Sequence, residues 1–424
     1  MLFCSFNGQN LFTLPSNFIP MNYPKIFLKP GKEAPVKRFH PWVFSGAISR
    51  SEGNPGEGEI VEVYSSHKEY LATGHFFRGN ISVKIFSFSQ STIDYNFWKE
   101  KIMASFELRK HLGMTETEYN NAYRLVFSEG DSLPGLIIDF YNGTAVIQCQ
   151  SAGMNNHRQE FVSALQEIYG NDLKEVYDKS IHTSSLPDRQ ASGIQHPASA
   201  IKEVSAYLYG KAEDVLIKET GHSFRVDIEK GQKTGFYLDQ RGNRMFAQYY
   251  AQGRKVLNAF CYSGAFSVYA LKGGATMVHS VDSSKEAIGW TRENMVLNGI
   301  PDQVHEEYMA DVKNFMLESK EMYDMIILDP PAFAKHHNVS HNALQAYIFI
   351  NSEALKKLNP GGILFTFSCS QAISREMFRS AVHSAAINTG KNIRILHQLS
   401  QGPDHPVSIF HPEGEYLKGL ILAI

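Results

Sequence analysis

The chain has 424 residues, of which 43% are hydrophobic and 20% are charged, and its formal net charge is −2. This composition is ordinary for a globular protein, and the length is enough for two or three domains. No apolar run reaches the roughly 18 residues that a membrane-spanning helix needs, so we expect no membrane partner. The overall charge does not by itself indicate a nucleic-acid-binding protein.

Residues 1–24 carry no charged side chain and are rich in Asn, Phe and Pro. A secretory signal needs a positively charged start and a small-residue cleavage site, and this leader has neither. We therefore predict a cytoplasmic protein whose residues 1–21 are disordered, unless Met21 is the true start.

The four cysteines are Cys4, Cys149, Cys261 and Cys369. None of them belongs to a C-x-x-C pair, so we expect neither a zinc knuckle nor a thioredoxin-like site, and we predict no metal. A reducing compartment fits this pattern and leaves single thiols free for chemistry.

Residues 22–92 predict a small β-barrel, because short β-rich runs alternate with Gly and Pro turns. The expected strands are Lys25–Leu28, Glu59–Tyr64, Tyr70–His75 and Ser82–Phe86, with a loop at His40–Phe44. Residues 22–90 contain nine Lys and Arg against six Asp and Glu, a local balance of +3. This balance fits an RNA-binding surface and equally fits an ordinary solvated face.

Residues 93–212 predict a central α+β domain. Its expected elements are a helix over 96–112, strands at Arg124–Phe127, Leu136–Phe140 and Thr144–Gln150, a helix over 155–169 and a strand at Lys174–Tyr177. Asn142-Gly143 favours a tight hairpin turn between two of these strands. Residues 181–200 are rich in Ser, Pro, His and Gly, so we interpret them as a polar loop or linker.

The pattern changes over residues 213–424, where strands alternate with helices after a first hairpin. The expected strands are Val215–Lys218, Ser223–Ile228, Val256–Phe260, Met277–Val281, Val304–Ala310, Met325–Leu328, Gly362–Ser368, Ile393–Leu399 and Leu417–Ile424. This alternation predicts an α/β fold, a Rossmann-like parallel sheet with helices on both faces. The last two strands have no helix between them, and a closing antiparallel hairpin is typical of class I methyltransferases.

A single glycine turns the chain after the first parallel strand of this sheet. Ligands of doubly wound sheets bind at the carboxyl ends of the strands. Dinucleotide folds need G-x-G-x-x-G here so that a pyrophosphate can approach the backbone, and the missing glycines argue for a ligand without phosphate. We assign Asn258, Phe260, Tyr262, Ser263 and Gly264 to cofactor binding.

Asp282 ends the next strand, where a carboxylate can accept hydrogen bonds from both hydroxyls of a ribose, and Ser283 follows it. Asp311 ends the third strand, where it can hold an adenine amino group. For each aspartate, the alternative role is that of a helix N-cap. Together, these strand ends predict a cleft for S-adenosylmethionine.

Asp329-Pro330-Pro331-Ala332-Phe333 follows the fourth strand. The two prolines fix a rigid extended turn, so we expect Asp329 to project into the cleft. Phe333 offers a ring on which a base can stack. The motif resembles the D-P-P-[FYW] signature of enzymes that methylate nucleobases, and we assign Asp329 to both catalysis and cofactor binding.

Cys369 ends the fifth strand and is the candidate nucleophile. We expect the helix that follows it to lower the pKa of its thiol. The alternative is an ordinary buried cysteine, which serves as a small apolar residue. Cys261 is the competing thiol, although it belongs to the cofactor loop.

The segment Gly231–Arg241 precedes the first parallel strand and is dense in polar groups and aromatic rings. It ends in a helix that carries Arg241 and Arg244, which disfavours a plain solvated loop. We expect it to close over the cofactor through Gln232, Thr234, Gly235 and Phe236.

In this order, the segments GQKTGFYLDQRGNR, VLNAFCYSGAFS, DPPAF and FSCS resemble the large-subunit rRNA cytosine-5 methyltransferase I family. The resemblance extends over nearly the whole chain from Tyr23. HPWVFSGAI is similar to the opening of that family's PUA domain, an RNA-binding barrel, and RLVFSEGDSLPGLIIDFYNG is similar to its central domain. The resemblance implies a SAM-dependent enzyme that methylates cytosine in large-subunit (23S) ribosomal RNA.

By this resemblance, Cys369 attacks carbon 6 of a flipped-out cytosine, which makes carbon 5 nucleophilic toward the methyl group. Asp329 would hydrogen-bond the ring nitrogen and the amino group of the base. Many RNA cytosine-5 methyltransferases carry a second Cys after the Pro of the fourth-strand motif, but this chain has Pro331-Ala332. The group that accepts the carbon-5 proton is therefore unassigned.

Two alternatives stay open. One is a base-nitrogen methyltransferase that uses DPPAF and in which Cys369 is a bystander. The other is an RNA-binding protein with a non-catalytic methyltransferase fold. A nicotinamide oxidoreductase is disfavoured by the missing glycines. The sequence does not identify the target nucleotide. It also leaves open whether the substrate is naked RNA or an assembled particle, and whether the protein forms a homodimer.

Overall fold

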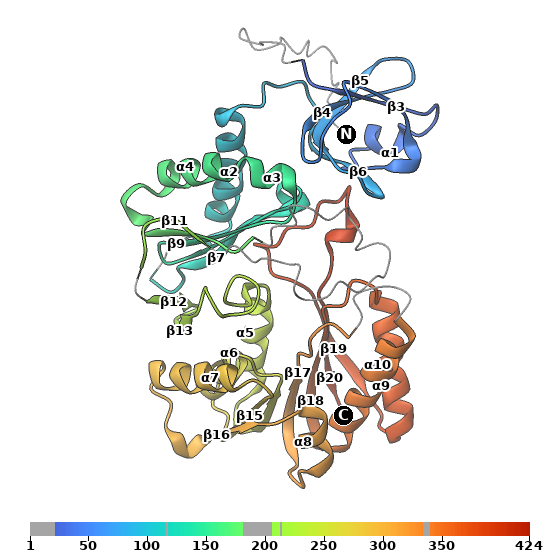
Figure 1. Ribbon diagram of the computed structural model, residues 1–424. Coiled ribbons are helices and arrows are strands. Elements are labelled where there is room, and N and C mark those ends of the chain that lie inside the picture. The colour runs from blue at the N-terminus through green and yellow to red at the C-terminus, as the bar shows by residue number, and fades with distance from the viewer. Residues whose placement is uncertain (1–21, 116–117, 181–205, 213, 334–339) are drawn as a thin grey trace, which may run out of the picture.

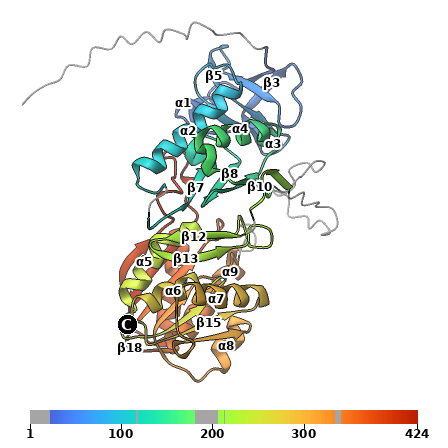
Figure 2. The ribbon, with the colours of Figure 1, turned by 90° about the vertical axis from the view of Figure 1, so that its left-hand side faces the viewer.

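The computed structural model describes residues 22–115, 118–180, 206–212, 214–333 and 340–424. The predicted leader at 1–21 and the predicted loop at 181–200 lie outside these ranges. Figures 1 and 2 show three large sheets that follow one another along the molecule in chain order. Among the helices of the described ranges, none combines the length and apolarity of a membrane-spanning segment.

The first sheet contains all four predicted strands and two more, in the order β2-β6-β5-β4-β1-β3. Its strands are β1 (Lys25–Leu28), β2 (Trp42–Phe44), β3 (Ile48–Glu52), β4 (Ile60–Tyr64), β5 (Tyr70–Phe76) and β6 (Ile81–Ser87), with the short helix α1 (Ala34–Lys37). The prediction of a loop at His40–Phe44 is wrong for its last three residues. Val43 pairs with Val83 of β6 and both are buried, so Trp-Val-Phe forms an edge strand.

The central sheet has the order β11-β10-β9-β8-β7, with helices on one face. Its elements are α2 (Tyr95–His111), β7 (Ala122–Phe127), β8 (Leu136–Tyr141), β9 (Thr144–Cys149), α3 (Ala152–Asn156), α4 (Arg158–Tyr169), β10 (Glu175–Asp178) and β11 (Ala206–Tyr209). The predicted Asn142-Gly143 turn is confirmed, with both residues at positive φ. The single helix predicted over 155–169 is two helices in the structure, α3 and α4, which are separated at His157. The first begins earlier than predicted, because Ser151 caps α3 by accepting a hydrogen bond from the Met154 N–H.

The third part of the chain contains the hairpin β12 (Val215–Glu219) and β13 (His222–Val226), followed by the large sheet. Its strands are β14 (Lys255–Ala259), β15 (Met277–Asp282), β16 (His305–Met309), β17 (Tyr323–Leu328), β18 (Leu358–Ser368), β19 (Arg394–Leu399) and β20 (Lys418–Ala423). The order is β16-β15-β14-β17-β18-β20-β19, and β20 runs antiparallel to both of its neighbours. The predicted closing hairpin is therefore confirmed.

In the described part of the chain, six α-helices cover the large sheet on both faces, as predicted. They are α5 (Arg241–Tyr250), α6 (Ala265–Lys272), α7 (Lys285–Leu297), α8 (Val312–Glu318), α9 (Ser340–Lys356) and α10 (Arg375–Thr389). Buried side chains of α5, α6 and α7 pack in the cores of one face, and those of α8, α9 and α10 pack in the core of the other. The helices cover the faces of the sheet, so loops surround the carboxyl ends of the parallel strands.

No pattern in the sequence indicates the path of residues 400–417, which link β19 to β20. This interdomain loop leaves the large sheet and extends toward the barrel in Figure 1. The ring centroid of Phe410 lies 5.2 Å from that of Phe39, and the ring centroid of His411 lies 4.4 Å from that of Trp42. The interdomain loop therefore contacts the barrel, which lies at the opposite end of the chain.

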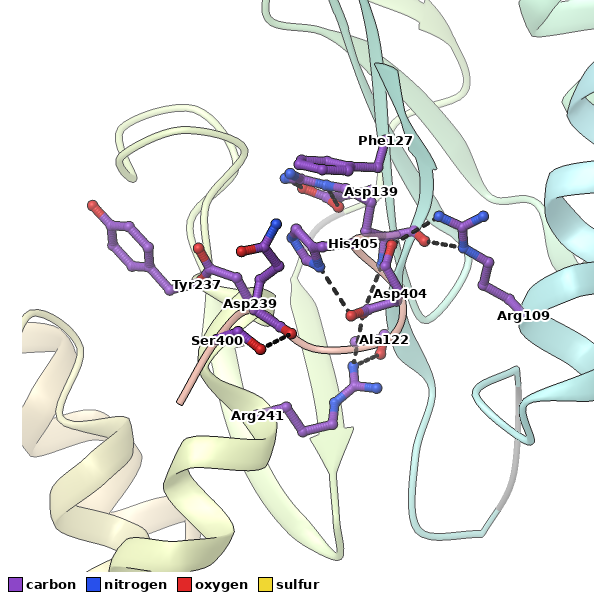
Figure 3. A network of polar contacts seen from close by, with 12 residues as sticks. Arg109, Ala122, Phe127, Asp139, Tyr237, Asp239, Arg241, Ser400, Asp404 and His405 are labelled. Carbon is purple, nitrogen blue, oxygen red and sulfur yellow. Dashed lines mark hydrogen bonds and ion pairs between the residues drawn. The ribbon is translucent and has the colours of Figure 1, made fainter. Parts of the chain in front are cut away.

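Asp404 fixes the interdomain loop to the central sheet (Figure 3). Its main-chain oxygen accepts a 2.8 Å hydrogen bond from Arg109, and its Oδ2 accepts one of 3.2 Å from the N–H of Arg124. Its Oδ1 lies 2.9 Å from Nδ1 of His405, and Arg241 of α5 lies 3.8 Å from the same carboxylate. Because Asp404 and His405 are buried, these contacts hold the central sheet and the large sheet in one arrangement.

Candidate active site

The loop after β14 has an unusual backbone. Phe260, Tyr262 and Gly264 all have positive φ, at 62°, 49° and 72°. Bulky residues rarely adopt this region, and each such residue costs roughly 1–3 kcal/mol, so the surroundings must hold the loop in place. The Tyr262 N–H donates to Asp282 at 3.0 Å, and its hydroxyl donates to the main-chain oxygen of Gly235 at 2.9 Å. The predicted cofactor loop and the Gly231–Arg241 segment are therefore in contact.

The two strand-end aspartates differ in their roles. Asp282 is not the N-cap of α7, because Ser284 has that role and accepts a hydrogen bond from the Ala287 N–H. Each carboxylate oxygen of Asp282 instead accepts one main-chain N–H, from Tyr262 and from Ser284. Asp311 is the N-cap of α8, where it accepts a 2.9 Å hydrogen bond from Asn314.

Four of the predicted cofactor residues have buried side chains: Thr234, Phe236, Asn258 and Ser263. Asn258 donates a 2.8 Å hydrogen bond to Ser267 of α6, and Thr234 donates to Asp139 of the central sheet. Phe236 packs in the core beneath the hairpin β12–β13. The structure thus gives these side chains packing roles, whereas Ser283 is exposed and Gln232 accepts a hydrogen bond from the Tyr237 hydroxyl.

Asp329 lies directly after β17, as its position in the sequence predicts. Its Oδ2 accepts a 2.9 Å hydrogen bond from the side-chain amide of Gln240. Burial raises the pKa of Asp329 to about 7, and the neighbouring carboxylate of Asp239 adds to the rise. At neutral pH this carboxyl group therefore exists in both its protonated and its charged form.

Cys369 is half-buried at the end of β18, and its Sγ lies 4.0 Å from the main-chain oxygen of Pro330. The strand ends of β17 and β18 thus bring the thiol and the D-P-P motif together. Burial and then the charge of Asp329 raise the pKa of the thiol, while Lys233 opposes the rise. The expectation of a lowered thiol pKa is wrong, because α10 begins only at Arg375, with Ser374 as its N-cap.

The other predicted site side chains lie as follows. Cys261 is only 6% exposed, and its Sγ lies 3.7 Å from the hydroxyl of Thr291. Burial and then Asp282 raise the pKa of its thiol. The ring of Phe333 is half-buried, with its centroid 4.8 Å from that of Tyr347.

The structure brings further charged and polar residues to the site, and the sequence alone assigns no role to them. Lys233 lies 3.4 Å from Asp239, and Asp239 also accepts a hydrogen bond from the Tyr416 hydroxyl. Burial raises the pKa of Asp239, but Lys233 and His405 outweigh it and hold that pKa well below its usual range. The density of polar groups in Gly231–Arg241 was the only signal for Lys233, Asp239 and Gln240.

Comparison with family models agrees with this architecture. A model for S-adenosylmethionine-dependent methyltransferases matches residues 192–408, and a model for PUA-like domains matches residues 26–88. Two solved structures superpose on 94% of this chain and on all of their own chains, each at 24% sequence identity. One is described as a SAM-dependent methyltransferase from Streptococcus mutans (TM-score 0.78), and the other is a methyltransferase complexed with SAH (TM-score 0.79). These structures show the fold.

Relatives with established names are more similar in sequence. Ribosomal RNA large subunit methyltransferase I of Aeromonas hydrophila is 38% identical over 405 residues, which cover 94% of this chain and 98% of the relative. The protein of the same name from Shewanella amazonensis is 37% identical over 412 residues, which cover 94% and 99%. The chain therefore belongs to the ribosomal RNA large subunit methyltransferase I family, S-adenosylmethionine-dependent methyltransferases with an N-terminal PUA-like domain.

Proposed function

We propose that this protein methylates carbon 5 of a cytosine in large-subunit ribosomal RNA through a covalent adduct with Cys369. The observation that carries the proposal is the position of a half-buried thiol beside Asp329, at the adjoining ends of β18 and β17. Carbon 5 of cytosine is a weak nucleophile, so its methylation needs covalent activation of the ring. A thiol next to a carboxyl group that can hold a proton supplies this activation.

In the proposed mechanism, the Cys369 thiolate forms a bond to carbon 6, and the electron pair of the 5,6 double bond becomes available at carbon 5. Asp329 in its protonated form transfers its proton to the ring nitrogen and so neutralises the negative charge that develops on the ring. S-adenosylmethionine supplies the methyl group to carbon 5. A water molecule then accepts the carbon-5 proton, the 5,6 double bond is restored as the bond between sulfur and carbon 6 breaks and the thiolate leaves, and the ring nitrogen returns its proton to Asp329.

The residues at the strand ends fit the cofactor. Asp282 uses one lone pair of each oxygen to hold Tyr262 and Ser284, so each oxygen keeps a lone pair for a ribose hydroxyl. The backbone of Phe260–Gly264 lies beside it, held in strained conformations that pre-arrange the loop. We propose that this loop, Asp282 and the segment 231–237 hold the cofactor, and that Asp311 contacts the adenine while it caps α8.

We further propose that the barrel and the catalytic face both contact the RNA. A cavity of about 630 Å³ lies between the barrel, α2 and the interdomain loop. The rings of Phe39 and Phe410 line it and are about half exposed, which suits the stacking of unpaired bases. Contacts to phosphate would make binding fall steeply as the salt concentration rises.

The experiment that tests the proposal compares two single-cysteine variants in an RNA methylation assay. Cys369→Ala is expected to abolish turnover and to leave cofactor binding intact, because the thiol acts on the base. Cys261→Ala is the matched control and is expected to keep activity, since its thiol packs against Thr291. Each variant is also incubated with RNA that contains 5-fluorocytosine.

With this substrate the wild type and Cys261→Ala are expected to form a stable covalent complex. Fluorine at carbon 5 cannot leave as a proton does, so the adduct remains after methyl transfer. Methylation by Cys369→Ala at a near wild-type rate would reject the covalent mechanism and favour methylation of a base nitrogen. Absence of turnover in the wild type on ribosomal RNA would favour an RNA-binding protein with a non-catalytic fold.

A further inference from the structure

Lys418 is a buried lysine beside the proposed nucleophile. It is the first residue of β20 and lies opposite Ser368 of β18 in the antiparallel register. The residue is only 4% exposed, and its Nζ donates a 2.7 Å hydrogen bond to the main-chain oxygen of Ser370. Lysine is rarely buried unless a partner offsets the cost of removing its charge from water. The position therefore calls for a functional explanation.

The charged groups that act on Lys418 come from three elements. They are Cys369 after β18, Arg375 on α10 and Glu415 in the interdomain loop. Arg375 and Glu415 form an ion pair with each other, so their opposite charges largely offset. Burial lowers the pKa of Lys418 to about 8, and the side chain is still mostly charged at neutral pH. Of these three groups, Cys369 acts on Lys418 most strongly, and it raises the pKa of the lysine because a thiolate and an ammonium attract each other.

Cys369 lies in surroundings that oppose its thiolate. Asp329 and Asp239 act against the negative charge, and Tyr237 and Tyr347 also face the thiol. Lys233 favours the thiolate, but its side chain is 43% exposed and pairs with Asp239. Water and salt screen such an exposed charge more strongly than they screen a buried one.

We propose that Lys418 is a positioning residue for the nucleophile: it fixes the Cys369–Ser370 turn through the Ser370 carbonyl, and its charge stabilises the thiolate. This inference rests on the proposed function, in which Cys369 attacks the base. Lys418 exchanges no atom with the substrate, and it favours the charged sulfur as a fixed, water-excluded charge.

The test measures how fast iodoacetamide alkylates Cys369 in the full-length protein between about pH 6 and about pH 10, a range that spans the usual thiol pKa. Mass spectrometry of the Cys369 peptide separates this thiol from the other three. Lys418→Met removes the charge and the hydrogen bond. Lys418→Gln keeps a donor for the Ser370 carbonyl and removes only the charge.

Both variants are expected to alkylate about tenfold more slowly at neutral pH, which corresponds to a rise of about one unit in the thiol pKa. Lys418→Arg keeps a positive charge and is expected to retain the wild-type alkylation rate at neutral pH, where Lys418 itself is mostly charged. Lys101→Met is the matched control. Burial lowers the pKa of Lys101 to about 8, and its Nζ donates to the main-chain oxygen of Phe86. Lys101 lies on α2, away from the large sheet, so Lys101→Met is expected to leave the alkylation of Cys369 unchanged.

A wild-type pH profile for Cys369 in folded Lys418→Gln would overturn the inference. The inference would also be overturned if Cys369 were alkylated at neutral pH as slowly in Lys418→Arg as in Lys418→Gln. Thermal unfolding identifies variants that fail to fold, and the Gln and Arg variants carry the test where Lys418→Met does not fold. Methylation by Cys369→Ala would overturn the proposed function instead, and it would leave the alkylation result unchanged.

Discussion

Two loops of the large sheet place a cysteine at the carboxyl end of a parallel strand. The loop after β14 holds Cys261, which is 6% exposed and packs against Thr291 of α7. The loop after β18 holds Cys369, which is half-buried beside the D-P-P turn. Both thiols lie at strand ends, but the thiol of Cys261 is packed in the interior and the thiol of Cys369 is partly accessible.

The difference lies in what surrounds each loop. In the loop after β14, the N–H and the hydroxyl of Tyr262 donate hydrogen bonds to Asp282 and to Gly235, and its main-chain oxygen accepts one from the Thr291 hydroxyl. The loop after β18 has carboxyl and ammonium groups next to its thiol, from Asp329, Lys233 and Lys418. Position at a strand end therefore selects candidates for chemistry, and the neighbouring charges distinguish among them.

The largest expected effect concerns the loop after β18. Asp329→Asn is expected to lower methylation by roughly 10²- to 10⁴-fold, because an amide cannot deliver a proton to the ring nitrogen. Cofactor affinity, measured by calorimetry, is expected to change much less. The control is Asp324→Asn on the same strand, whose carboxylate bonds Asn359 and the Lys255 N–H at the opposite end. Equal losses of turnover in both variants would mean that the substitutions disturb the structure of the sheet, and the proton-donor role of Asp329 would be rejected.

The same side chain predicts a pH dependence of stability. The pKa of Asp329 is about 7 in the folded protein and 3.8 in an unperturbed aspartate, so between these values the folded state holds a proton that the unfolded state has lost. Asp329 therefore makes the free energy of unfolding fall as the pH rises from about 4 to about 7. Urea unfolding measured across this pH range is expected to show that the free energy of unfolding falls less with pH in Asp329→Asn than in the wild type. An unchanged decline would mean that Asp329 is charged throughout.

The fold was predictable from the sequence wherever one periodic pattern covers a whole element. The strands β14, β15, β17 and β18 are mostly buried, and a helix follows each of them along the chain. β2 was missed because three residues behind a proline are too short for a pattern. Its assignment depends on pairing with β6, which is distant in the sequence.

The site was predictable only in part. Asp329 and Cys369 end apolar strands in the sequence, so their meeting follows from the parallel topology. Lys418 reaches the site through the register of β18 with β20, and Asp239 and Gln240 reach it through the turn before α5. The interdomain loop has no periodic pattern, and its path is set by side-chain contacts such as Asp404 with Arg109 and Arg124.

A smaller effect is expected in the loop after β14, where cofactor affinity is the readout. Asp282→Ala is expected to weaken cofactor binding by about 2–4 kcal/mol, because it removes two charge-assisted hydrogen bonds to the ribose and frees the Tyr262 N–H. Ser374→Ala is the control, because Ser374 is a helix cap outside the proposed cofactor site. This substitution removes the cap of α10 and is expected to cost about 1 kcal/mol of stability while leaving cofactor affinity unchanged. Unchanged affinity in folded Asp282→Ala would reject the ribose assignment.

The smallest expected effect concerns stability alone. It tests whether the loop after β14 is tightly packed, as the comparison with the loop after β18 requires. Gly264 has φ +72°, and a Cβ built on it would lie 2.6 Å from Cγ2 of Thr291. Gly264→Ala is therefore expected to lower the free energy of unfolding by about 1–3 kcal/mol, from backbone strain and from the clash. Gly289→Ala in α7 is the control, because a Cβ there meets open space and alanine favours a helix by about 0.5–1 kcal/mol. Urea unfolding that gives both variants the same stability would mean that this loop adjusts freely, and Cys261 would then be less firmly packed than the contact with Thr291 indicates.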